Sequence, residues 1–256
     1  MDLEEPLLGG LVPGRVVRVG DTVRRPAGPW TPTIHALLRH IRAKGFPAPE
    51  PLGLDEKGRE VVSFLEGEVS NWPWPVALRG DGGLRAVAAM LRAYHAAVAD
   101  FSPPAGAVWV DGATLPGADE IILHGDFGPY NLVWRGARIV GVIDWDLARP
   151  GKPLADAAWA AIHSVPLRGD ADTRAMGFDQ PPNRRARLAT FAEAFGGVTP
   201  SQLLAEALAV QLAMMGLIER LGNAGLEPWA GHRRHGLVEG LRLEHQWLLQ
   251  AAPTLA

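Results

Sequence analysis

The sequence predicts an α+β protein of two lobes, a small β-rich N-terminal lobe over residues 1–68 and a larger, mainly helical C-terminal lobe over residues 69–256. Runs of β-branched residues separated by turn pairs crowd into the first lobe, which is typical of hairpins. Apolar residues at spacings of three and four dominate the second lobe and indicate amphipathic helices. Two short apolar runs, each followed by a polar loop, interrupt this helical pattern.

The first hairpin is expected where Gly20-Asp21 separates two β-branched runs, Val16–Val19 and Thr22–Arg25. A glycine followed by a short polar residue between such runs is typical of a tight turn. Pro26 ends the second strand, because proline has no N–H to donate to a ladder of hydrogen bonds.

A helix and a second hairpin follow in the smaller lobe. Thr31-Pro32 predicts an N-cap with proline at the first helical position, and Gly45 predicts the end of the helix. The apolar face between them is formed by Ile34, Leu37, Leu38 and Ile41. Residues 52–58 and 60–65 predict the hairpin, whose last strand runs into a hinge at Glu66-Gly67.

The larger lobe is expected to hold three long amphipathic helices, over residues 87–101, 201–221 and about 237–249. Two short strands, Ile121–Leu123 and Ile139–Ile143, lie between the first two helices and carry polar loops at their ends. We expect these strands to be neighbours, so that their loops point at one place.

The bulk composition limits the classes of function. The net charge is −3 and no run of Lys or Arg is present, so neither nucleic acid nor a membrane surface is expected as a partner. Apolar stretches are interrupted before they reach the length that spans a bilayer. The absence of cysteine excludes disulfides and thiol catalysis. The acidic N-terminus is unlike a secretory signal, and together with the chemistry below it favours the cytoplasm.

Three oxygen-bearing side chains follow the two short strands. Asp126 and Asn131 lie five residues apart in the loop after the first strand, and Asp144 closes the second apolar run. Phosphoryl transfer needs a carboxylate that accepts a hydroxyl proton, and an amide and a second carboxylate that hold Mg²⁺. We therefore predict Asp126 as the catalytic base and Asn131 and Asp144 as the metal ligands.

The phrase from His124 to Trp134, followed by Gly141–Asp146, resembles the aminoglycoside phosphotransferase and choline kinase-like family, which shares the protein-kinase fold. Its spacing matches the Asp-x-x-x-x-Asn of a kinase catalytic loop. The resemblance implies a two-lobed protein-kinase-like fold and Mg²⁺-dependent transfer of the terminal phosphate of ATP or GTP. The implied acceptor is a hydroxyl of a small molecule, with an aminoglycoside or a related amino sugar or amino alcohol as the leading class. The protein would be a monomer or a homodimer.

The same resemblance assigns supporting roles to three further residues. His124 resembles the first residue of the kinase His-Arg-Asp triplet, which packs below the catalytic loop. Asp156 matches a later acidic residue of the family that braces this loop. Asp146 is either a contact to metal or nucleotide or a turn residue.

The residues expected to bind the nucleotide phosphates depart from the family pattern. Kinases pair a strand lysine with the α/β-phosphates and with a helix Glu, and none of the three lysines of this chain lies on the strand. Strand alternation places Arg25 on the same face as Val23, so Arg25 is the expected phosphate ligand. The helix after it has no Glu, and His35 is the nearest polar replacement.

Further nucleotide contacts are expected from the strand that leads into the hinge, at Ser63, Phe64 and Leu65. The glycines at 9, 10 and 14 are a weak match to a phosphate-covering loop. The helical lobe presents the acceptor pocket in this family, and four carboxylates there are candidates to bind a polycation: Asp170, Asp172, Glu193 and Glu227. Residues 69–256 count 18 acidic against 16 basic residues, less acidic than an aminoglycoside specialist should be.

Two other classes of function stay open. A nucleotide-binding pseudokinase would keep the fold without turnover, which the missing lysine and Glu favour and the intact triad of Asp126, Asn131 and Asp144 disfavours. A metal-dependent hydrolase could use His124, Asp126 and Asp144 as ligands. It would need further histidines at matching positions, and the sequence does not offer that spacing.

Overall fold

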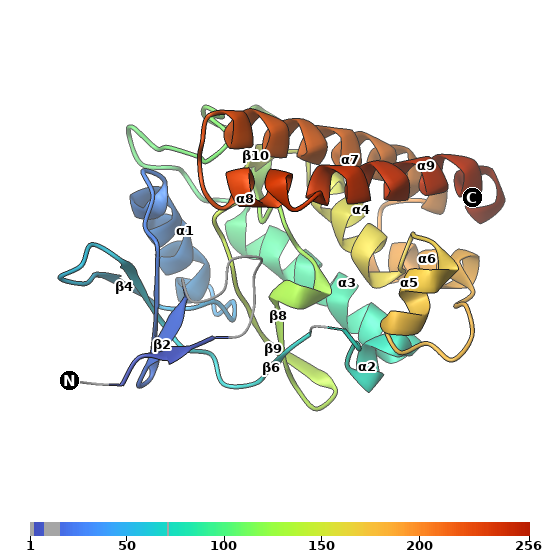
Figure 1. Ribbon diagram of the computed structural model, residues 1–256, viewed down its shortest axis with the longest axis horizontal. Coiled ribbons are helices and arrows are strands. Elements are labelled where there is room, and N and C mark those ends of the chain that lie inside the picture. The colour runs from blue at the N-terminus through green and yellow to red at the C-terminus, as the bar shows by residue number, and fades with distance from the viewer. Residues whose placement is uncertain (1–2, 8–15, 71) are drawn as a thin grey trace.

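A five-stranded antiparallel sheet with one helix forms the N-terminal part of the computed structural model, which describes residues 3–7, 16–70 and 72–256 (Figure 1). The order of the strands in the sheet is β1-β2-β3-β5-β4. Their bounds are β1 Glu5–Pro6, β2 Val17–Val19, β3 Thr22–Arg25, β4 Pro51–Leu54 and β5 Glu60–Ser63. Both expected hairpins are therefore present, with Gly20 in the turn of the first at φ +58.

The helix of this part is α1, Thr31–Ala43, which buries the expected apolar face against the rest of the protein. Its N-cap is Trp30 and not Thr31, so the expected start was wrong by one residue. The Thr31 hydroxyl accepts a hydrogen bond from the Gly28 N–H at 2.9 Å instead of capping the helix. Gly45, at φ +80, follows the helix as expected.

The C-terminal part is mainly helical and lies beside the sheet, so that the sheet and the end of α9 are at opposite sides of the molecule (Figure 1). The bounds of its helices are α2 Val76–Arg79, α3 Asp81–Val98, η1 Pro129–Asn131, α4 Pro153–Ser164, α5 Asp170–Ala175, α6 Arg184–Phe195, α7 Pro200–Asn223, α8 Trp229–Arg234 and α9 Leu237–Leu255. The three long helices expected from apolar spacing correspond to α3, α7 and α9.

The two short apolar runs do not pair with each other, which corrects the expectation that they are neighbouring strands. β7 (Ile121–Leu123) pairs with β10 (Arg149–Gly151) in one small sheet. β9 (Arg138–Val142) pairs with β8 (Leu132–Arg135), which pairs with β6 (Glu68–Val69) in another. Their loops meet for a different reason, given below.

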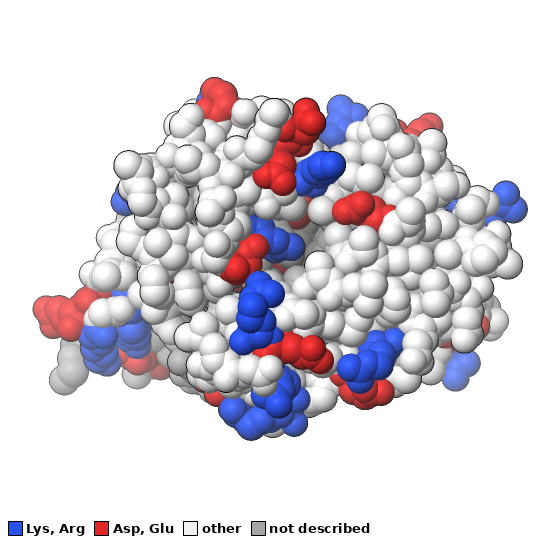
Figure 2. All heavy atoms as spheres, turned by 90° about the horizontal axis from the view of Figure 1, so that it is seen from above, with Lys and Arg blue, Asp and Glu red and all other residues white. Residues whose placement is uncertain are grey.

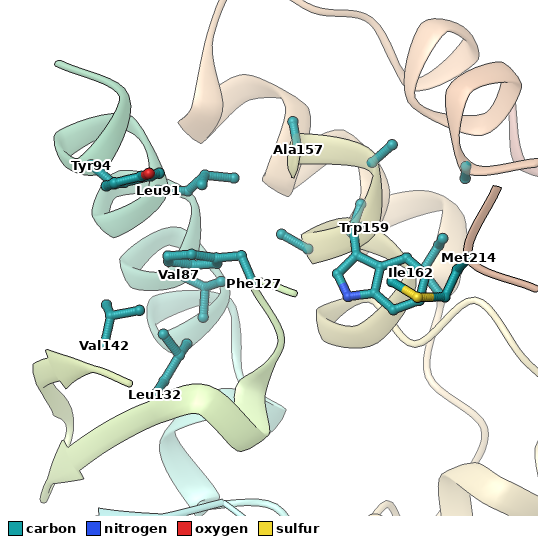
Figure 3. Packing of buried hydrophobic residues seen from close by; sticks show 14 of the residues in the cluster. Val87, Leu91, Tyr94, Phe127, Leu132, Val142, Ala157, Trp159, Ile162 and Met214 are labelled. Carbon is teal, nitrogen blue, oxygen red and sulfur yellow. The ribbon is translucent and has the colours of Figure 1, made fainter. Parts of the chain in front are cut away.

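A single apolar cluster runs from α1 through α3 and α4 to α7 and α9. Phe127, from the loop after β7, is fully buried in it and faces α3 beside Val87 and Leu91 (Figure 3). Trp159 on α4 lies on the other side of this loop (Figure 3). The loop that carries Asp126 is thus anchored in the core through its own next residue.

Within the described residues, α7 alone is long and apolar enough to cross a membrane by length and composition. This corrects the expectation that every apolar stretch is too short. In the structure α7 packs against α4, α8 and α9 and buries Leu203, Ala207 and Leu217. It is a core helix of the C-terminal part.

Arg187 on α6 ties three segments of the C-terminal part together. Its guanidinium donates to the carbonyl oxygens of Leu78 and Arg79 at the end of α2, at 3.0 and 2.8 Å. It also donates to those of Ser164 and Val165 at the end of α4, at 2.8 and 3.2 Å. The residue is 5% exposed, so these carbonyls depend on it for hydrogen bonds.

Arg187→Ala is expected to lower the free energy of unfolding by about 3 kcal/mol or more, because several buried carbonyls lose their donor at once. Urea denaturation measures the loss, and Arg185→Ala on the exposed face of the same helix is the matched control. A loss below about 1 kcal/mol, the level of an ordinary substitution, would show that Arg187 does not hold these segments.

Candidate active site

The loops after β7 and β9 lie side by side because backbone and ring hydrogen bonds join them. Ile143 N–H donates to the Asn131 carbonyl at 2.9 Å, and His124 Nε2 lies 3.1 Å from the Ile143 carbonyl oxygen. The His124 ring also contacts Trp145, with ring centroids 4.5 Å apart. These contacts bring Asp126, Asn131 and Asp144 to one place although their strands belong to different sheets.

His124 is neutral, with its hydrogen on Nε2. The Asp126 N–H donates to His124 Nδ1 at 3.2 Å, so Nδ1 is the acceptor and Nε2 donates to the Ile143 carbonyl. Burial lowers the pKa of His124, which favours this uncharged form. Both ring nitrogens are therefore hydrogen-bonded to backbone groups.

Asp156 on α4 holds the backbone of the Asp126 loop from below. Its two oxygens accept from His124 N–H at 2.8 Å and Gly125 N–H at 2.9 Å, and one lies 3.3 Å from His95 Nε2. Burial alone would raise the pKa of Asp156, but the hydrogen bond from His95 and the backbone donors hold it below its usual value. Gly125 is required here, because a Cβ would lie 2.1 Å from the Leu147 carbonyl oxygen.

Asp126 is half-buried and oriented by three side-chain donors. Its Oδ1 accepts from Tyr130 Oη at 2.5 Å and from Trp159 Nε1 at 2.8 Å. Its Oδ2 accepts from Asn131 Nδ2 at 3.0 Å. Burial and the nearby charge of Asp144 raise the pKa of Asp126 to about 7, although these donors oppose the shift. Its environment matches that of a general base.

Tyr130 and Trp159 were not expected from the sequence. Tyr130 lies four residues after Asp126 in the same loop, and its hydroxyl reaches back across the turn. A tyrosine at that offset could have been noticed. Trp159 comes from α4, and no local pattern links it to Asp126.

Asn131 and Asp144 present oxygen ligands of the kind that Mg²⁺ prefers. Asn131 donates both of its amide hydrogen bonds to Asp126, to Oδ2 and to the carbonyl at 2.9 Å, which leaves the amide oxygen as a free acceptor. The Asp144 side chain is 54% exposed, and its backbone has φ 63, a left-handed conformation that is uncommon for a residue other than glycine. These two residues fit a hard divalent cation that keeps further positions for water and phosphate.

Among the described residues, no group of three or more His, Cys, Asp and Glu is arranged to hold a metal ion by itself. At a site with one amide and one carboxylate, water and the phosphates of a nucleotide would supply the remaining ligands. His124 is also not available as a ligand, because both of its nitrogens are hydrogen-bonded within the protein.

Arg25 lies at the meeting point of the N-terminal sheet and the second motif. Its guanidinium contacts Asp144 Oδ1 at 2.9 Å and Asp146 Oδ1 at 2.6 Å, and its Nε donates to Glu60. These carboxylates raise the pKa of Arg25 further, against the effect of burial. Arg24 points elsewhere and pairs with Asp55 at 3.7 Å. The strand phase expected from Val23 therefore places Arg25, and not Arg24, toward the motif loops.

The carboxylate that pairs with Arg25 comes from a strand and not from a helix. Glu60 on β5 lies directly opposite Arg25 in the ladder between β3 and β5 and is 1% exposed. His35 on α1, the expected replacement for the helix Glu, contacts the other Glu60 oxygen at 2.9 Å. Burial alone would raise the pKa of Glu60, but His35 and Arg25 hold it below its usual value. Glu60 was missed, although the predicted hairpins could have suggested its register.

The remaining expected residues lie around this site in different ways. Asp146 contacts Arg25, which favours a role in orienting the Arg25 guanidinium. Leu65 lies against Gly141, where a Cβ would come within 2.4 Å of Leu65 Cδ1. The Ser63 hydroxyl accepts a hydrogen bond from the Glu50 N–H. The centroid of the Phe64 ring lies 3.9 Å from the Arg18 guanidinium. The glycines at 9, 10 and 14 lie outside the described residues.

Parts of this chain are similar to known proteins. The model of the phosphotransferase enzyme family matches residues 107–191, which include Asp126, Asn131, Asp144 and Asp156. A trifolitoxin immunity protein from Rhizobium leguminosarum bv. trifolii is 42% identical over 153 residues, which are 56% of this chain and 57% of that protein. The chain spans little more than half the length of this curated relative, and a quarter or less of two others.

Solved structures share the whole architecture. A choline/ethanolamine kinase family protein from Mesorhizobium loti has a TM-score of 0.55 at 18% identity, covering 98% of this chain and 92% of that one. An amicoumacin kinase in complex with AMP-PNP, Ca²⁺ and Ami has a TM-score of 0.62 at 9% identity, covering 94% and 87%. At such identities the likeness shows the fold. The family match over residues 107–191 shows that this part of the chain is similar to the phosphotransferase enzyme family, and the solved structures show that the chain has a protein-kinase-like fold.

Proposed function

We propose that this protein is a Mg²⁺-dependent kinase that moves the terminal phosphate of ATP or GTP to a hydroxyl of a small molecule. The observation that carries the proposal is the arrangement of Asp126, held by three donors, next to Asn131 and Asp144. Phosphoryl transfer depends mainly on positioning and charge, so a carboxylate fixed in one orientation is what the reaction requires.

Asp126 orients the acceptor hydroxyl and takes its proton as the bond to phosphorus forms. Tyr130 and Trp159 both donate to Asp126 Oδ1, and Asn131 donates to Oδ2. The carboxylate therefore cannot rotate away from the acceptor. A pKa near 7 suits a base that gains its proton late and must release it before the next cycle.

Asn131 and Asp144 hold the metal ion, which when bound neutralises charge on the transferring phosphate. Arg25 reaches the same place from β3 and binds the phosphates that precede the transferred one. Glu60 and His35 keep Arg25 in position, as a helix Glu does for the lysine in other kinases. Residues 1–68 would then form the nucleotide lobe and residues 69–256 the catalytic lobe, with the hinge at Glu66-Gly67.

The biological role proposed for the reaction is inactivation of a toxic compound. The support is the 42% identity over 153 residues to a trifolitoxin immunity protein, whose name states protection against a toxin. Phosphorylation of a hydroxyl adds charge and bulk to a small molecule, which commonly abolishes recognition by its target.

The other two functions have weaker support. A metal-dependent hydrolase would need His124 as a metal ligand, but both of its ring nitrogens are hydrogen-bonded to the backbone. The pseudokinase hypothesis rests on the absence of the strand lysine and the helix Glu that kinases pair. Arg25 and Glu60 supply the same pair of charges from neighbouring strands, so the reason for expecting lost turnover is removed.

Arg25→Ala is expected to lower nucleotide affinity at least tenfold, because a charge-assisted hydrogen bond of about 1.5–3 kcal/mol is lost. Calorimetric titration with Mg-nucleotide measures it. Arg24→Ala is the matched control and should bind as the wild type does, since Arg24 faces Asp55.

Arg25→Lys should recover part of the affinity, because it keeps the charge and leaves Glu60 paired. Equal losses in the Arg24 and Arg25 alanine variants would point to general damage to the sheet. Wild-type affinity in Arg25→Ala would remove Arg25 from the phosphate site.

Asp144→Ala is expected to abolish Mg²⁺-dependent nucleotide binding and turnover, because a site with two protein ligands loses its only charged one. Binding is titrated with and without Mg²⁺ present. If Mg²⁺ strengthens nucleotide binding equally in variant and wild type, the Asp144 carboxylate is not a metal ligand.

Asp126→Asn is expected to lower kcat by about 10² or more while nucleotide affinity stays nearly unchanged, since a positioned base contributes about 10²–10⁴. Steady-state turnover with an accepted alcohol and a nucleotide titration together separate the two effects. Near wild-type turnover in the variant would exclude Asp126 as the base.

The pH profile is a further prediction from the same residue. Only the ionised Asp126 accepts a proton, so kcat/KM for the acceptor should fall as pH drops through a pKa of about 7. This parameter reports the enzyme before the acceptor has bound. A flat profile between pH 6 and 8, expected for a base with the ordinary Asp pKa of about 3.9, would contradict it.

A further inference from the structure

Arg18 on β2 is a charged side chain on the N-terminal sheet that none of the steps above uses. It lies directly opposite Val23 in the ladder between β2 and β3, and directly opposite residues share one face of a sheet. Val23 shares its face with Arg25, because side chains two residues apart along a strand point the same way. Arg25 contacts Asp144 from this face. Arg18 is therefore on the face of the sheet that is directed toward the motif loops.

The spacing of Arg18 and Arg25 fits the two ends of one nucleotide. Two residues along a strand cover about 7 Å and neighbouring strands are about 5 Å apart, so the two Cα atoms are about 8 Å from each other. Arg25 is the residue proposed to bind the phosphates. A nucleotide whose phosphates reach Arg25 can extend its ribose and base along the same face to Arg18.

Three contacts hold the Arg18 guanidinium beside the expected hinge. Its Nη2 donates to Glu66 Oε1 at 3.0 Å, and its Nε donates to the Gly20 carbonyl oxygen at 2.8 Å. The guanidinium also lies 3.9 Å from the centroid of the Phe64 ring. Phe64 is one of the residues expected from the sequence to contact the nucleotide, and Glu66 belongs to the expected hinge. The guanidinium thus lies at the segment where the base of the nucleotide is expected.

Arg18 retains donors for a ligand. An arginine has five N–H groups, and the hydrogen bonds of Arg18 to the described residues use two of them. Its side chain is 29% exposed, so a bound molecule can contact it. A second arginine, Arg135 on β8, donates to the Glu66 carbonyl oxygen at 3.1 Å. The side chains at this hinge therefore supply donors, and a carbonyl that could accept from a base already has a partner.

Guanine and adenine differ in what they present to such donors. Guanine carries two acceptors, O6 and N7, side by side on one edge, and an arginine binds this pair through two N–H groups. Adenine carries the acceptor N7 beside the amino group N6, which donates. A guanidinium has donors only, so it complements the guanine edge and leaves the adenine amino group without an acceptor.

The overall charge of the site does not distinguish the two nucleotides, because ATP and GTP carry the same triphosphate. On the face drawn in Figure 2, acidic and basic side chains alternate along the central hollow without a large patch of either sign. The choice between the two nucleotides therefore depends on the donors and acceptors that lie beside the base.

We propose that Arg18 binds the O6 and N7 edge of guanine, so that GTP is the preferred phosphate donor. Glu66 and Phe64 hold the guanidinium in place for this contact. Arg24, the neighbouring arginine on β3, lies on the opposite face and takes no part. The inference rests on the proposed kinase function and resolves its choice between ATP and GTP.

Calorimetric titration of the whole chain with the β,γ-imido analogues of GTP and ATP, each with Mg²⁺, tests the inference. A bidentate contact of this kind discriminates between bases by about fivefold or more. The Kd of the GTP analogue is therefore expected to be at least about fivefold below that of the ATP analogue. Equal affinities, or tighter binding of the ATP analogue, would overturn the inference and leave the kinase function standing.

Arg18→Gln is the accompanying variant, because a glutamine amide offers one donor and one acceptor and complements adenine at N6 and N7. It should abolish the preference for the GTP analogue or reverse it. Arg18→Lys keeps the charge beside Glu66 but loses the two parallel donors, so it should retain only part of the preference. Arg24→Gln, which removes the pair with Asp55 on the opposite face, is the matched control and should keep the wild-type ratio of the two Kd values.

The ratio is measured with both analogues on the same folded sample, so partial unfolding of a variant does not imitate a loss of preference. A wild-type ratio in Arg18→Gln would show that Arg18 does not recognise the base. Loss of the preference in Arg24→Gln as well would assign it to the sheet in general and overturn the role of Arg18. If the wild type binds neither analogue, the kinase function is overturned together with the inference.

Discussion

One partly buried guanidinium, that of Arg25, joins the two parts of the molecule through three carboxylates. Glu60 comes from the N-terminal sheet, and Asp144 and Asp146 come from the loop after β9. Three negative charges this close to one another would repel without a cation, and the partly buried Arg25 would lose its partners without them. The orientation of the sheet relative to the loops after β7 and β9 thus depends on this group, and the proposed phosphate site lies where the sheet and the loops meet.

The proposed base, Asp126, is held by a second set of contacts that does not include Arg25. Asp156 binds two backbone N–H groups of the Asp126 loop, Phe127 fixes the loop in the core, and Trp159 orients the carboxylate. All of these come from the C-terminal part or from the loop itself. The Asp126 carboxylate is therefore held in place without a nucleotide, while the proposed nucleotide site depends on how the sheet and the loops meet.

The fold, and the grouping of Asp126, Asn131 and Asp144 at one place, could be predicted because they follow from local sequence. β-Branched runs around turn pairs gave the two N-terminal hairpins, and apolar spacing gave the long helices α3, α7 and α9. The offsets between Asp126, Asn131 and Asp144 were readable in one short segment, and the strand phase at Val23 placed Arg25.

The residues that were missed act across the fold. Glu60 meets Arg25 only because β3 and β5 pair in one particular register, and Trp159 reaches Asp126 only because α4 packs under the loop. The pairing of β7 with β10, and of β9 with β8, was also missed, because strands of three to five residues carry little information about their partners. The site is nevertheless assembled, since hydrogen bonds at Ile143 do what a shared sheet was expected to do.

A crystal structure with Mg²⁺ and a non-hydrolysable nucleotide tests the central claim most directly. The account predicts Mg²⁺ at about 2.0–2.1 Å from an oxygen of Asp144 and from the Asn131 amide oxygen. It also predicts that the Arg25 guanidinium contacts a phosphate while Glu60 still holds it. A nucleotide bound away from these residues, or Arg25 in contact with protein carboxylates alone, would contradict it.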